Sequence, residues 1–255
     1  MQAPGTGRWR PGGIEDDAGS WRRLTVITID YFSDILCVWA YGGQIRLDEL
    51  QREFADDVRV RYRFLALFGD TRTRIGVGWS DQGGFAGFGR HLQEVCAQWG
   101  HTRLHPGVWA DCRPRSCVTA HAFLKSVSLC LGLEQDEGQS DRAACSVFDA
   151  LTVQTRVAFF EQAQDISSLP VLIDLLRTTD LSVDAVMAKI ENGEAYAALH
   201  RDQELAKSYG VLGSPTYVFN AGRQLLYGNV GYRIIESNVR ELMLPQHVEG
   251  EPSWC

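Results

Sequence analysis

Alternating hydrophobic and polar positions predict two strands in the first quarter of the chain. Residues 24–32 read Leu-Thr-Val-Ile-Thr-Ile-Asp-Tyr-Phe and are rich in β-branched and aromatic side chains, which favours a strand. Residues 58–67 alternate Val, Val, Tyr and Phe with arginines, so this strand has one solvated face where it begins. Between the two, apolar residues from Trp39 to Phe54 follow a helical spacing. The pattern therefore predicts a β-α-β unit.

Helical spacing replaces this alternation over residues 69–209. The segments that suit helices are residues 88–99, 116–131, 142–164, 169–178, 183–192 and 194–209. Ser168 and Ser182 stand before two of these segments, and serine is a preferred N-cap residue of helices. We therefore expect a large insertion made only of helices.

The strand pattern returns after Gly210. Residues 215–219 and 224–227 predict two short strands, joined by a hairpin-length turn that contains a glycine. A last helix is expected over residues 232–243, ahead of Pro245. The predicted order is β-α-β, a helical insertion and β-β-α, which is an α/β fold.

Composition and charge narrow the class of protein. Hydrophobic residues make up 45% and charged residues 22% of the 255 residues, as in globular proteins, so a disordered chain is excluded. The net charge of -7 repels phosphate backbones, and we expect no nucleic-acid partner unless a basic patch is separated from the acidic surface. No run approaches the roughly 18 apolar residues of a spanning helix, so no membrane partner is expected.

The cysteines indicate a reduced environment. There are 7 of them, an odd number, and they are scattered along the chain. Residues 1–23 contain no apolar segment of a secretory signal, so we expect a cytoplasmic protein. The same residues are rich in glycine and proline and are expected to form a flexible leader.

One group of cysteines and histidines is dense enough to be tested as a metal site. It comprises Cys112, Cys117, His101, His105 and His121. Structural zinc sites use closely spaced ligand pairs within a compact loop, whereas prolines interrupt this group and His121 falls in a predicted helix. We therefore expect no metal site.

Four fragments of the chain carry a resemblance to a known family. They are residues 30–41 (DYFSDILCVWAY), 120–125 (AHAFLK), 158–166 (AFFE, then Asp165 and Ile166) and 210–220 (GVLGSPTYVFN). In this order they resemble the DsbA family of thioredoxin-fold proteins. The fragments in the insertion are most similar to the cytoplasmic branch that also contains 2-hydroxychromene-2-carboxylate isomerases and kappa-class glutathione transferases. The resemblance implies a thioredoxin-like fold with a mixed sheet.

The resemblance also implies a division of the chain into parts. Residues 24–68 and 210–245 are expected to form the thioredoxin-like domain, and residues 69–209 the helical insertion. Residues 1–23 form the leader and residues 246–255 a C-terminal tail.

Cys37 is the candidate catalytic residue. A thiol at the start of a helix faces free backbone N–H groups and the positive end of the helix dipole, which predicts a lowered pKa. The redox motif of the family is Cys-x-x-Cys, whereas this chain reads Cys37-Val-Trp-Ala40 and lacks the resolving thiol there. Cys37 can still react as a single thiol and form a mixed disulfide. An external thiol, or the distant Cys112 or Cys117, would then resolve that mixed disulfide. The alternative is that Cys37 is a small buried hydrophobic residue.

Five further residues are candidates for substrate binding. The resemblance implies a cis peptide bond at Pro215, which would place the backbone of Ser214 beside the catalytic cysteine. Asn229 and Arg233 lie in the turn where relatives bind the glutamyl end of glutathione, and an ordinary surface turn is the alternative. Trp39 lies inside the cysteine motif, where it would line a groove or pack in the core.

These residues support three hypotheses of function. The first is a DsbA-like thiol-disulfide oxidoreductase that acts through Cys37 alone on a thiol or disulfide substrate. The second is a glutathione-dependent isomerase or transferase, in which glutathione itself supplies the thiolate. The third is a non-catalytic thioredoxin-fold module that binds a peptide beside Pro215. We expect no tightly bound cofactor; glutathione is the candidate cosubstrate and a homodimer the candidate assembly.

Overall fold

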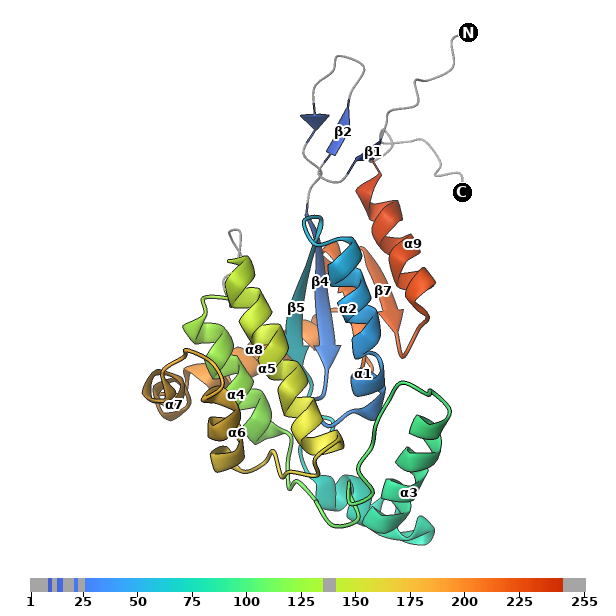
Figure 1. Cartoon of the computed structure of the whole chain (residues 1–255), viewed down its shortest axis with the longest axis vertical. Helices are drawn as coiled ribbons and strands as arrows, with labels where there is room; N and C mark the ends of the chain where they lie inside the picture. Colours follow the sequence, from blue (N-terminus) through green and yellow to red (C-terminus); the bar gives the residue numbers. More distant parts are fainter. Residues whose placement is uncertain (1–8, 11–12, 16–20, 23–25, 135–140, 245–255) are drawn as a thin grey trace.

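A four-stranded mixed sheet forms the centre of the structure, a computed structural model that describes residues 9–10, 13–15, 21–22, 26–134 and 141–244. Across the sheet the strands are β5 (Val58–Phe64), β4 (Ile27–Ser33), β6 (Thr216–Phe219) and β7 (Gln224–Tyr227). β4 and β5 run parallel, and β6 is antiparallel to both of its neighbours (Figure 1). The mixed sheet that the resemblance implied is present.

The predicted β-α-β unit is present, but its helix is divided. α1 (Val38–Gly42) follows β4, and α2 (Gln44–Glu53) begins after Gly43. A Cβ atom on Gly42 would overlap the ring of Trp99, which packs against this part of the chain. A glycine is therefore required at that contact, and consecutive glycines weaken a continuous helix.

The elements that the structure describes between β5 and β6 are all helical. They are the π-helical segment η1 (Arg72–Val77), the 3₁₀ turn η2 (Ser80–Gln82), α3 (Gly84–Ala97), α4 (Val118–Cys130), α5 (Arg142–Phe160), α6 (Leu169–Leu176), α7 (Val183–Glu191) and α8 (Glu194–Ser208). All of the helices predicted from the spacing are found. The Ser182 hydroxyl caps α7 by accepting from the backbone N–H of Ala185, whereas Ser168 precedes α6 without a side-chain cap.

Different helices cover the two faces of the sheet. α2 and α9 (Tyr232–Met243) lie on one face, where Ile29 and Tyr31 are buried (Figure 1). α8 lies on the other face, where Phe32 and Val218 belong to a second hydrophobic cluster. α8 also contacts α4, so the last helix of the predicted insertion is at the same time a layer of the sheet domain.

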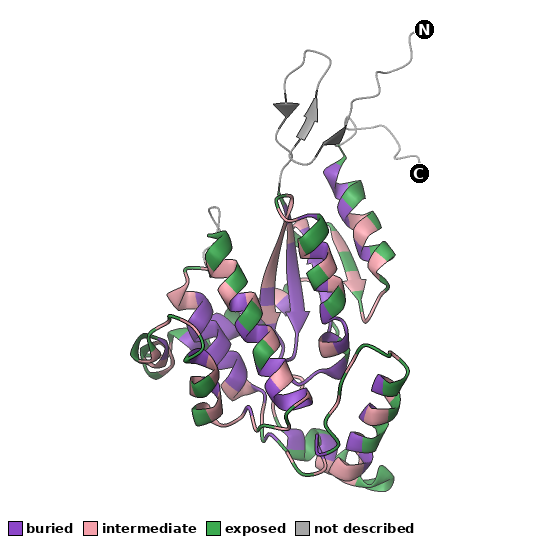
Figure 2. Ribbon diagram, in the orientation of Figure 1, coloured by how far each residue is buried: buried purple, intermediate pink, exposed green. Residues whose placement is uncertain are grey.

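The helices α4 to α7 pack together on the β5 side of the sheet, and α4 is the most buried of them (Figures 1 and 2). Lys125 of α4 is fully buried, and its Nζ lies 2.8 Å from a carboxylate oxygen of Asp202 in α8. The same Nζ lies 2.9 Å from a carboxylate oxygen of Glu134 and donates to the backbone carbonyl of Tyr62 in β5 at 3.3 Å. These contacts attach the helical insertion to the edge of the sheet.

Part of the predicted leader, residues 1–23, has regular structure. β1 (Trp9–Arg10), β2 (Gly13–Glu15) and β3 (Trp21–Arg22) form a separate antiparallel sheet with β2 in the middle. Strands this short produce no recognisable alternation among glycines and prolines. The predicted tail, residues 246–255, lies outside the described residues. Of the helices described, none is long and apolar enough to cross a membrane.

Candidate active site around Cys37

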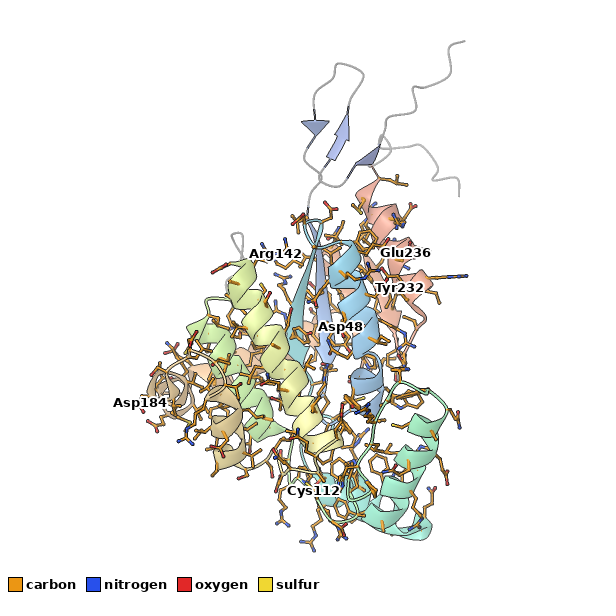
Figure 3. All side chains as sticks on the ribbon, in the orientation of Figure 1. Asp48, Cys112, Arg142, Asp184, Tyr232 and Glu236 are labelled. Carbon is orange, nitrogen blue, oxygen red and sulfur yellow. The ribbon has the colours of Figure 1, made fainter. Side chains whose placement is uncertain are left out.

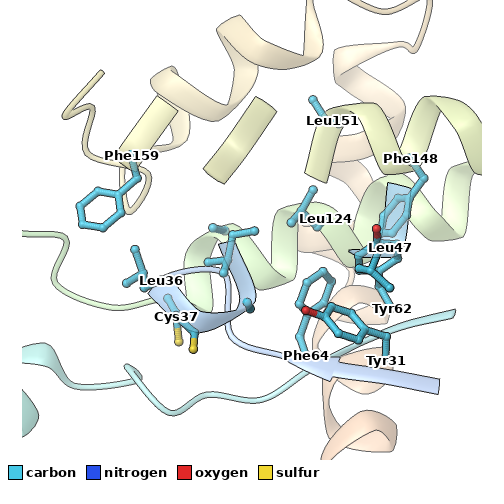
Figure 4. Packing of buried hydrophobic residues seen from close by; sticks show 14 of the residues in the cluster. Tyr31, Leu36, Cys37, Leu47, Tyr62, Phe64, Leu124, Phe148, Leu151 and Phe159 are labelled. Atoms are coloured by element: carbon cyan, nitrogen blue, oxygen red, sulfur yellow. The ribbon is translucent and has the colours of Figure 1, made fainter. Parts of the chain in front are cut away.

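Asp34 shapes the turn that places Cys37 at the end of β4. Its carboxylate accepts hydrogen bonds from the backbone N–H of Leu36 and of Phe68, both at 2.8 Å. Its backbone carbonyl accepts one from the N–H of Cys37 at 3.1 Å. Cys37 is therefore the N-cap residue of α1, and Figure 4 shows it beside Leu36 on the segment between β4 and α1. The thiol stands at the start of a helix, as the sequence predicted.

The loop before β6 lies directly against Cys37. The Ser214–Pro215 peptide bond is cis. The Cys37 thiol donates to the carbonyl of Ser214, with 3.4 Å between sulfur and oxygen. The Ser214 hydroxyl accepts from the backbone N–H of Asp34 at 3.0 Å. These contacts bring Cys37, Ser214 and Pro215 together although they are far apart in the sequence.

The expected lowering of the Cys37 pKa is wrong. Burial raises the pKa of this thiol, because the residue is only 5% exposed and a thiolate there loses its hydration. The carboxylate of Asp34 raises that pKa as well. The Ser214 side chain and backbone hydrogen bonds at Trp39 and Ala40 favour the thiolate, but they do not offset burial. The start of the helix supplies backbone N–H donors that favour the thiolate, as the sequence predicted. Burial of the thiol has the larger effect on its pKa.

Asp34, Cys117 and His121 form a fully buried cluster beside this turn. Burial raises the pKa of Asp34 to about 6. Hydrogen bonds from backbone N–H groups and from the Cys117 thiol oppose this rise. Burial lowers the pKa of His121 to about 3, so its imidazole is neutral, and Nε2 accepts from the N–H of Ile35 at 3.0 Å. His121 is thus a hydrogen-bonded core histidine next to the site.

The same cluster is the group of potential metal ligands found among residues 26–134 and 141–244. Its three ligand atoms lie within 4.8 Å of one another. The acceptor nitrogen of the neutral His121 ring already binds the N–H of Ile35, so a metal there would leave a buried N–H without an acceptor. The donor set therefore does not fit a metal ion. His101, His105 and Cys112 do not belong to this cluster.

Both distant cysteines have raised pKa values, which disfavours either of them as a resolving thiol at neutral pH. Burial and the neighbouring Asp34 raise the pKa of Cys117 far above its usual range, so Cys117 stays protonated. Cys112 is half-buried near the end of the insertion that carries α3 (Figure 3), and burial raises its pKa to about 11. The six cysteines within the described residues are all free thiols.

The remaining predicted residues have separate surroundings. Trp39 is 43% exposed, and its ring centre lies 4.9 Å from that of Trp99. The side-chain oxygen of Asn229 accepts from the guanidinium of Arg46 at 2.5 Å. Arg233 is exposed at the start of α9. Arg46 of α2 therefore binds the side-chain oxygen of Asn229.

Comparison with known proteins assigns the chain to a family. The family model described as the DSBA-like thioredoxin domain matches residues 28–240. The chain belongs to the DsbA-like thioredoxin family. No curated protein matches the chain.

Solved structures share the DsbA-like fold of this chain. A structure described as a probable DsbA oxidoreductase from Streptomyces coelicolor has a TM-score of 0.65 and 18% identity, over 87% of this chain and 93% of that one. The cytosolic disulfide reductase DsbM from Pseudomonas aeruginosa with GSH has a TM-score of 0.60 and 18% identity, over 84% and 99%. A 2-hydroxychromene-2-carboxylate isomerase has a TM-score of 0.55 and 15% identity, over 84% and 95%. At these identities the likeness shows the fold alone.

Two residues of this DsbA-like site were missed by sequence reasoning. Asp34 was not among the candidate residues, although its side chain accepts from the backbone N–H of Leu36, in the turn to Cys37, and from that of Phe68. Arg46 was not among them either. A polar residue directly before a catalytic turn is a signal that would have found Asp34, whereas nothing local marks Arg46.

Proposed function

We propose that this DsbA-like protein exchanges thiols and disulfides through Cys37 acting alone. The observation that carries the proposal is the contact of the Cys37 thiol with the Ser214 carbonyl, 3.4 Å away, directly before a cis proline. Ala40 is fully buried and stands where the second cysteine of the family motif would be. The single thiol therefore needs an external thiol to complete a cycle.

The exchange begins when the Cys37 thiolate attacks one sulfur of a disulfide R–S–S–R. A Cys37–S–S–R bond forms, the original S–S bond breaks, and the other half leaves as R–S⁻. The proton lost by Cys37 passes to solvent. A second thiol R′–SH then attacks the mixed disulfide as its thiolate, which releases R–S–S–R′ and restores Cys37. Glutathione is the proposed cosubstrate for either half of this cycle.

The raised pKa slows this exchange without preventing it. At neutral pH, a smaller fraction of Cys37 is thiolate than in an exposed cysteine. A thiolate of higher pKa is the better nucleophile, with a Brønsted coefficient of about 0.4–0.5. A thiolate fraction reduced tenfold therefore lowers the rate only about three- to fourfold.

Loss of the Cys37 proton also changes the hydrogen bond to Ser214. A thiolate or a mixed disulfide has no proton to donate, so the Ser214 carbonyl loses this donor during the reaction. A partly buried carbonyl without a donor is unfavourable. A backbone N–H of the substrate would replace the lost donor, which supports a peptide or glutathione as the group attached to the reacting sulfur.

The proposal is tested by incubating the protein with glutathione disulfide and measuring its intact mass, followed by peptide mapping. We expect one glutathione on Cys37 in the wild type and none at that position in Cys37→Ser. Cys112→Ser is the matched control, because Cys112 is another partly accessible free thiol, and it should be modified at Cys37 like the wild type. No adduct at Cys37 would contradict the proposal.

A second test restores the dithiol motif with Ala40→Cys. A cysteine three residues after Cys37 stands one helical turn along, within reach of its sulfur. Insulin reduction with dithiothreitol should then rise above the wild-type rate. An equal rate in wild type and variant would mean that another cysteine resolves Cys37. Circular dichroism checks the fold, because the added sulfur enters a buried position.

The other hypotheses have less support from the site. The amide oxygen of Asn229, expected to face glutathione in an isomerase or transferase, is held by Arg46. If peptides bind beside Pro215 and Cys37 never forms an adduct, the protein is a non-catalytic binding module. The cytoplasmic location and the homodimer stay predictions.

A further inference from the structure

The segment between β5 and α4 is positively charged in a negatively charged protein. Residues 70–117 contain six arginines and four acidic residues, whereas the whole chain has a net charge of -7. The arginines are Arg72, Arg74, Arg90, Arg103, Arg113 and Arg115. None of these arginines forms an ion pair with a residue that the structure describes. This segment therefore has positive charge available for an anion from outside the protein.

One of these arginines, Arg74, lies near the candidate active site. Its guanidinium carbon is 4.8 Å from the centre of the Phe68 ring. The backbone N–H of Phe68 donates to the Asp34 carboxylate at 2.8 Å, and the Asp34 carbonyl accepts from the N–H of Cys37 at 3.1 Å. Burial raises the pKa of Asp34, and the positive charge of Arg74 is among the influences that oppose this rise. Phe68 and Asp34 thus connect Arg74 to the turn that carries Cys37.

Arg74 is held in place and is also free to bind a ligand. Stacking on the Phe68 ring restricts the guanidinium. The residue is exposed, and its side chain makes no hydrogen bond or ion pair with residues 26–134 or 141–244. A planar guanidinium with free N–H groups binds a carboxylate through two parallel hydrogen bonds. A substrate carboxylate is therefore the group that this side chain fits.

We infer that Arg74 binds a carboxylate of the thiol or disulfide that reacts with Cys37, so that the site selects small anionic disulfides over neutral and cationic ones. This inference rests on the proposed function and specifies its substrate class. The exchange itself is unchanged: Cys37 forms the mixed disulfide with one half, and the other half leaves as a thiolate. Arg74 contacts the carboxylate and takes no part in the sulfur chemistry.

Two other roles of Arg74 predict different results. If Arg74 only packs on Phe68, its removal changes stability and leaves the relative rates of different disulfides unchanged. If its charge only favours the Cys37 thiolate, its removal lowers the rate of adduct formation at Cys37 by the same factor for every disulfide. Carboxylate binding is the role that changes the ratio of rates between disulfides of different charge.

Three disulfides of similar length distinguish these roles: dithiodipropionate carries two carboxylates, bis-hydroxyethyl disulfide is neutral, and cystamine carries two ammonium groups. The rate of adduct formation at Cys37 is measured for each by mass spectrometry and divided by the rate for the same protein unfolded in urea. This division removes the intrinsic reactivity of each disulfide. In the wild type we expect the normalised rate with the anionic disulfide to be about fivefold higher than the rate with the neutral one. The rate with the cationic disulfide should be the lowest. The preference should shrink in about 1 M salt, where the Debye length is about 3 Å.

Arg74→Gln should remove most of the preference: the rate with dithiodipropionate falls about fivefold and the rate with the neutral disulfide changes little. Arg74→Lys keeps the charge and should retain part of the preference. Arg113→Gln is the matched control, because Arg113 also stacks on a ring, that of Phe85 at 5.3 Å, and has no described ion-pair partner. It should leave the three relative rates unchanged.

Equal normalised rates of the three disulfides in the wild type would overturn the inference, and so would an unchanged preference in Arg74→Gln. Either result leaves the proposed function intact. Absence of an adduct at Cys37 with all three disulfides overturns the proposed function, and the inference with it. If Arg74→Gln does not fold, the salt dependence of the wild-type preference and the behaviour of Arg74→Lys decide the question.

Discussion

Lys125 and Asp34 are both fully buried, yet the structure surrounds them differently. The Nζ of Lys125 lies 2.8 Å from a carboxylate oxygen of Asp202, so charge faces charge at the edge of β5. The carboxylate of Asp34 faces backbone N–H groups, the Cys117 thiol and the neutral ring of His121, 3.7 Å away. One buried cluster holds opposite charges in pairs, and the other holds polar groups without an ion partner.

This difference shows where the protein keeps groups that can exchange protons. A buried ion pair resists separation, because removing one partner leaves an uncompensated charge. Burial raises the pKa of Asp34 to about 6 and that of Cys37 above its usual value. It raises the pKa of Asp202 as well, but there the charges of Lys125 and Arg63 oppose the rise. The cluster around Lys125 therefore fixes the insertion to the sheet, whereas the cluster around Cys37 responds to pH.

The largest effect is expected from Asp202→Ala, which leaves the charge of Lys125 without this partner in the interior. Breaking a buried pair from one side lowers the free energy of unfolding by about 3–5 kcal/mol. Urea denaturation measures the change. Glu204→Ala is the control on the same helix: Glu204 forms an exposed pair with Lys207, and its loss should matter by less than about 1 kcal/mol. Similar losses in both variants would contradict the comparison.

Asp34→Asn should produce the next largest effect and sharpen the comparison at the active site. An amide has one acceptor oxygen, whereas Asp34 accepts from both Leu36 and Phe68, so one buried N–H loses its acceptor at about 1–3 kcal/mol. The pKa of Cys37 should fall, because the carboxylate that raises it is gone. The pH dependence of iodoacetamide alkylation measures that pKa. An unchanged or higher midpoint in Asp34→Asn would show that Asp34 does not act on the thiol.

The wild-type protein provides the third prediction, a steep pH dependence of Cys37 alkylation. Burial raises this pKa above 9.0, so the thiolate fraction is still small at pH 8 and rises more than about fivefold by pH 9. Asp34 shifts the pKa of Cys37 in the same direction, because above its own pKa of about 6 its carboxylate is negatively charged and opposes the thiolate. An ordinary exposed thiol gains only about fourfold or less over the same interval. The urea-unfolded protein is the internal control, and a curve that levels off below pH 8 would refute the raised pKa.

The smallest effect is expected from Ser214→Ala. The Ser214 hydroxyl accepts from the N–H of Asp34 at 3.0 Å, so its removal leaves a donor without this partner and costs about 1 kcal/mol. The backbone carbonyl that contacts Cys37 remains, but the side chain that lowers the pKa of Cys37 is gone, so the alkylation midpoint should move to higher pH. Thermal unfolding measures the stability, and a loss of more than about 3 kcal/mol would mean that the hydroxyl holds the whole loop.

Segments with a strong local period were predicted closely. The last helix was expected over residues 232–243 and α9 spans the same residues, because its apolar spacing is regular and a proline follows. The hairpin strand 224–227 is likewise found as expected. In both elements the local pattern and the packing agree.

The division of the first helix was not predicted, because its cause is tertiary. Trp99 packs where a side chain on residue 42 would lie, and the sequence does not show that α3 ends beside α1. The π-helical segment over residues 72–77 was also missed, since its residues lack the regular apolar spacing of an amphipathic helix.

For the candidate site, the sequence predicted that Cys37 and the Ser214–Pro215 pair lie together, but not the electrostatics around the thiol. The motif around Cys37 and the Ser-Pro pair before β6 were recognised from residue order, and the structure brings them into contact. The sign of the Cys37 pKa shift depends on how completely the chain covers the sulfur, which no local motif records. Arg74 has no motif either, because its relation to the site runs through Phe68 and Asp34.

The contact between Cys37 and Ser214 has a consequence during synthesis of the protein. The two residues are 177 positions apart, so a ribosome that adds about 5–20 residues per second needs about 9–35 s to make the second after the first. During this interval the thiol lacks the loop that contacts its sulfur, and its pKa is that of an ordinary cysteine. A larger fraction is then thiolate than in the finished protein. The nascent chain is therefore more easily oxidised at Cys37 than the folded product, and completion of β6 covers its sulfur.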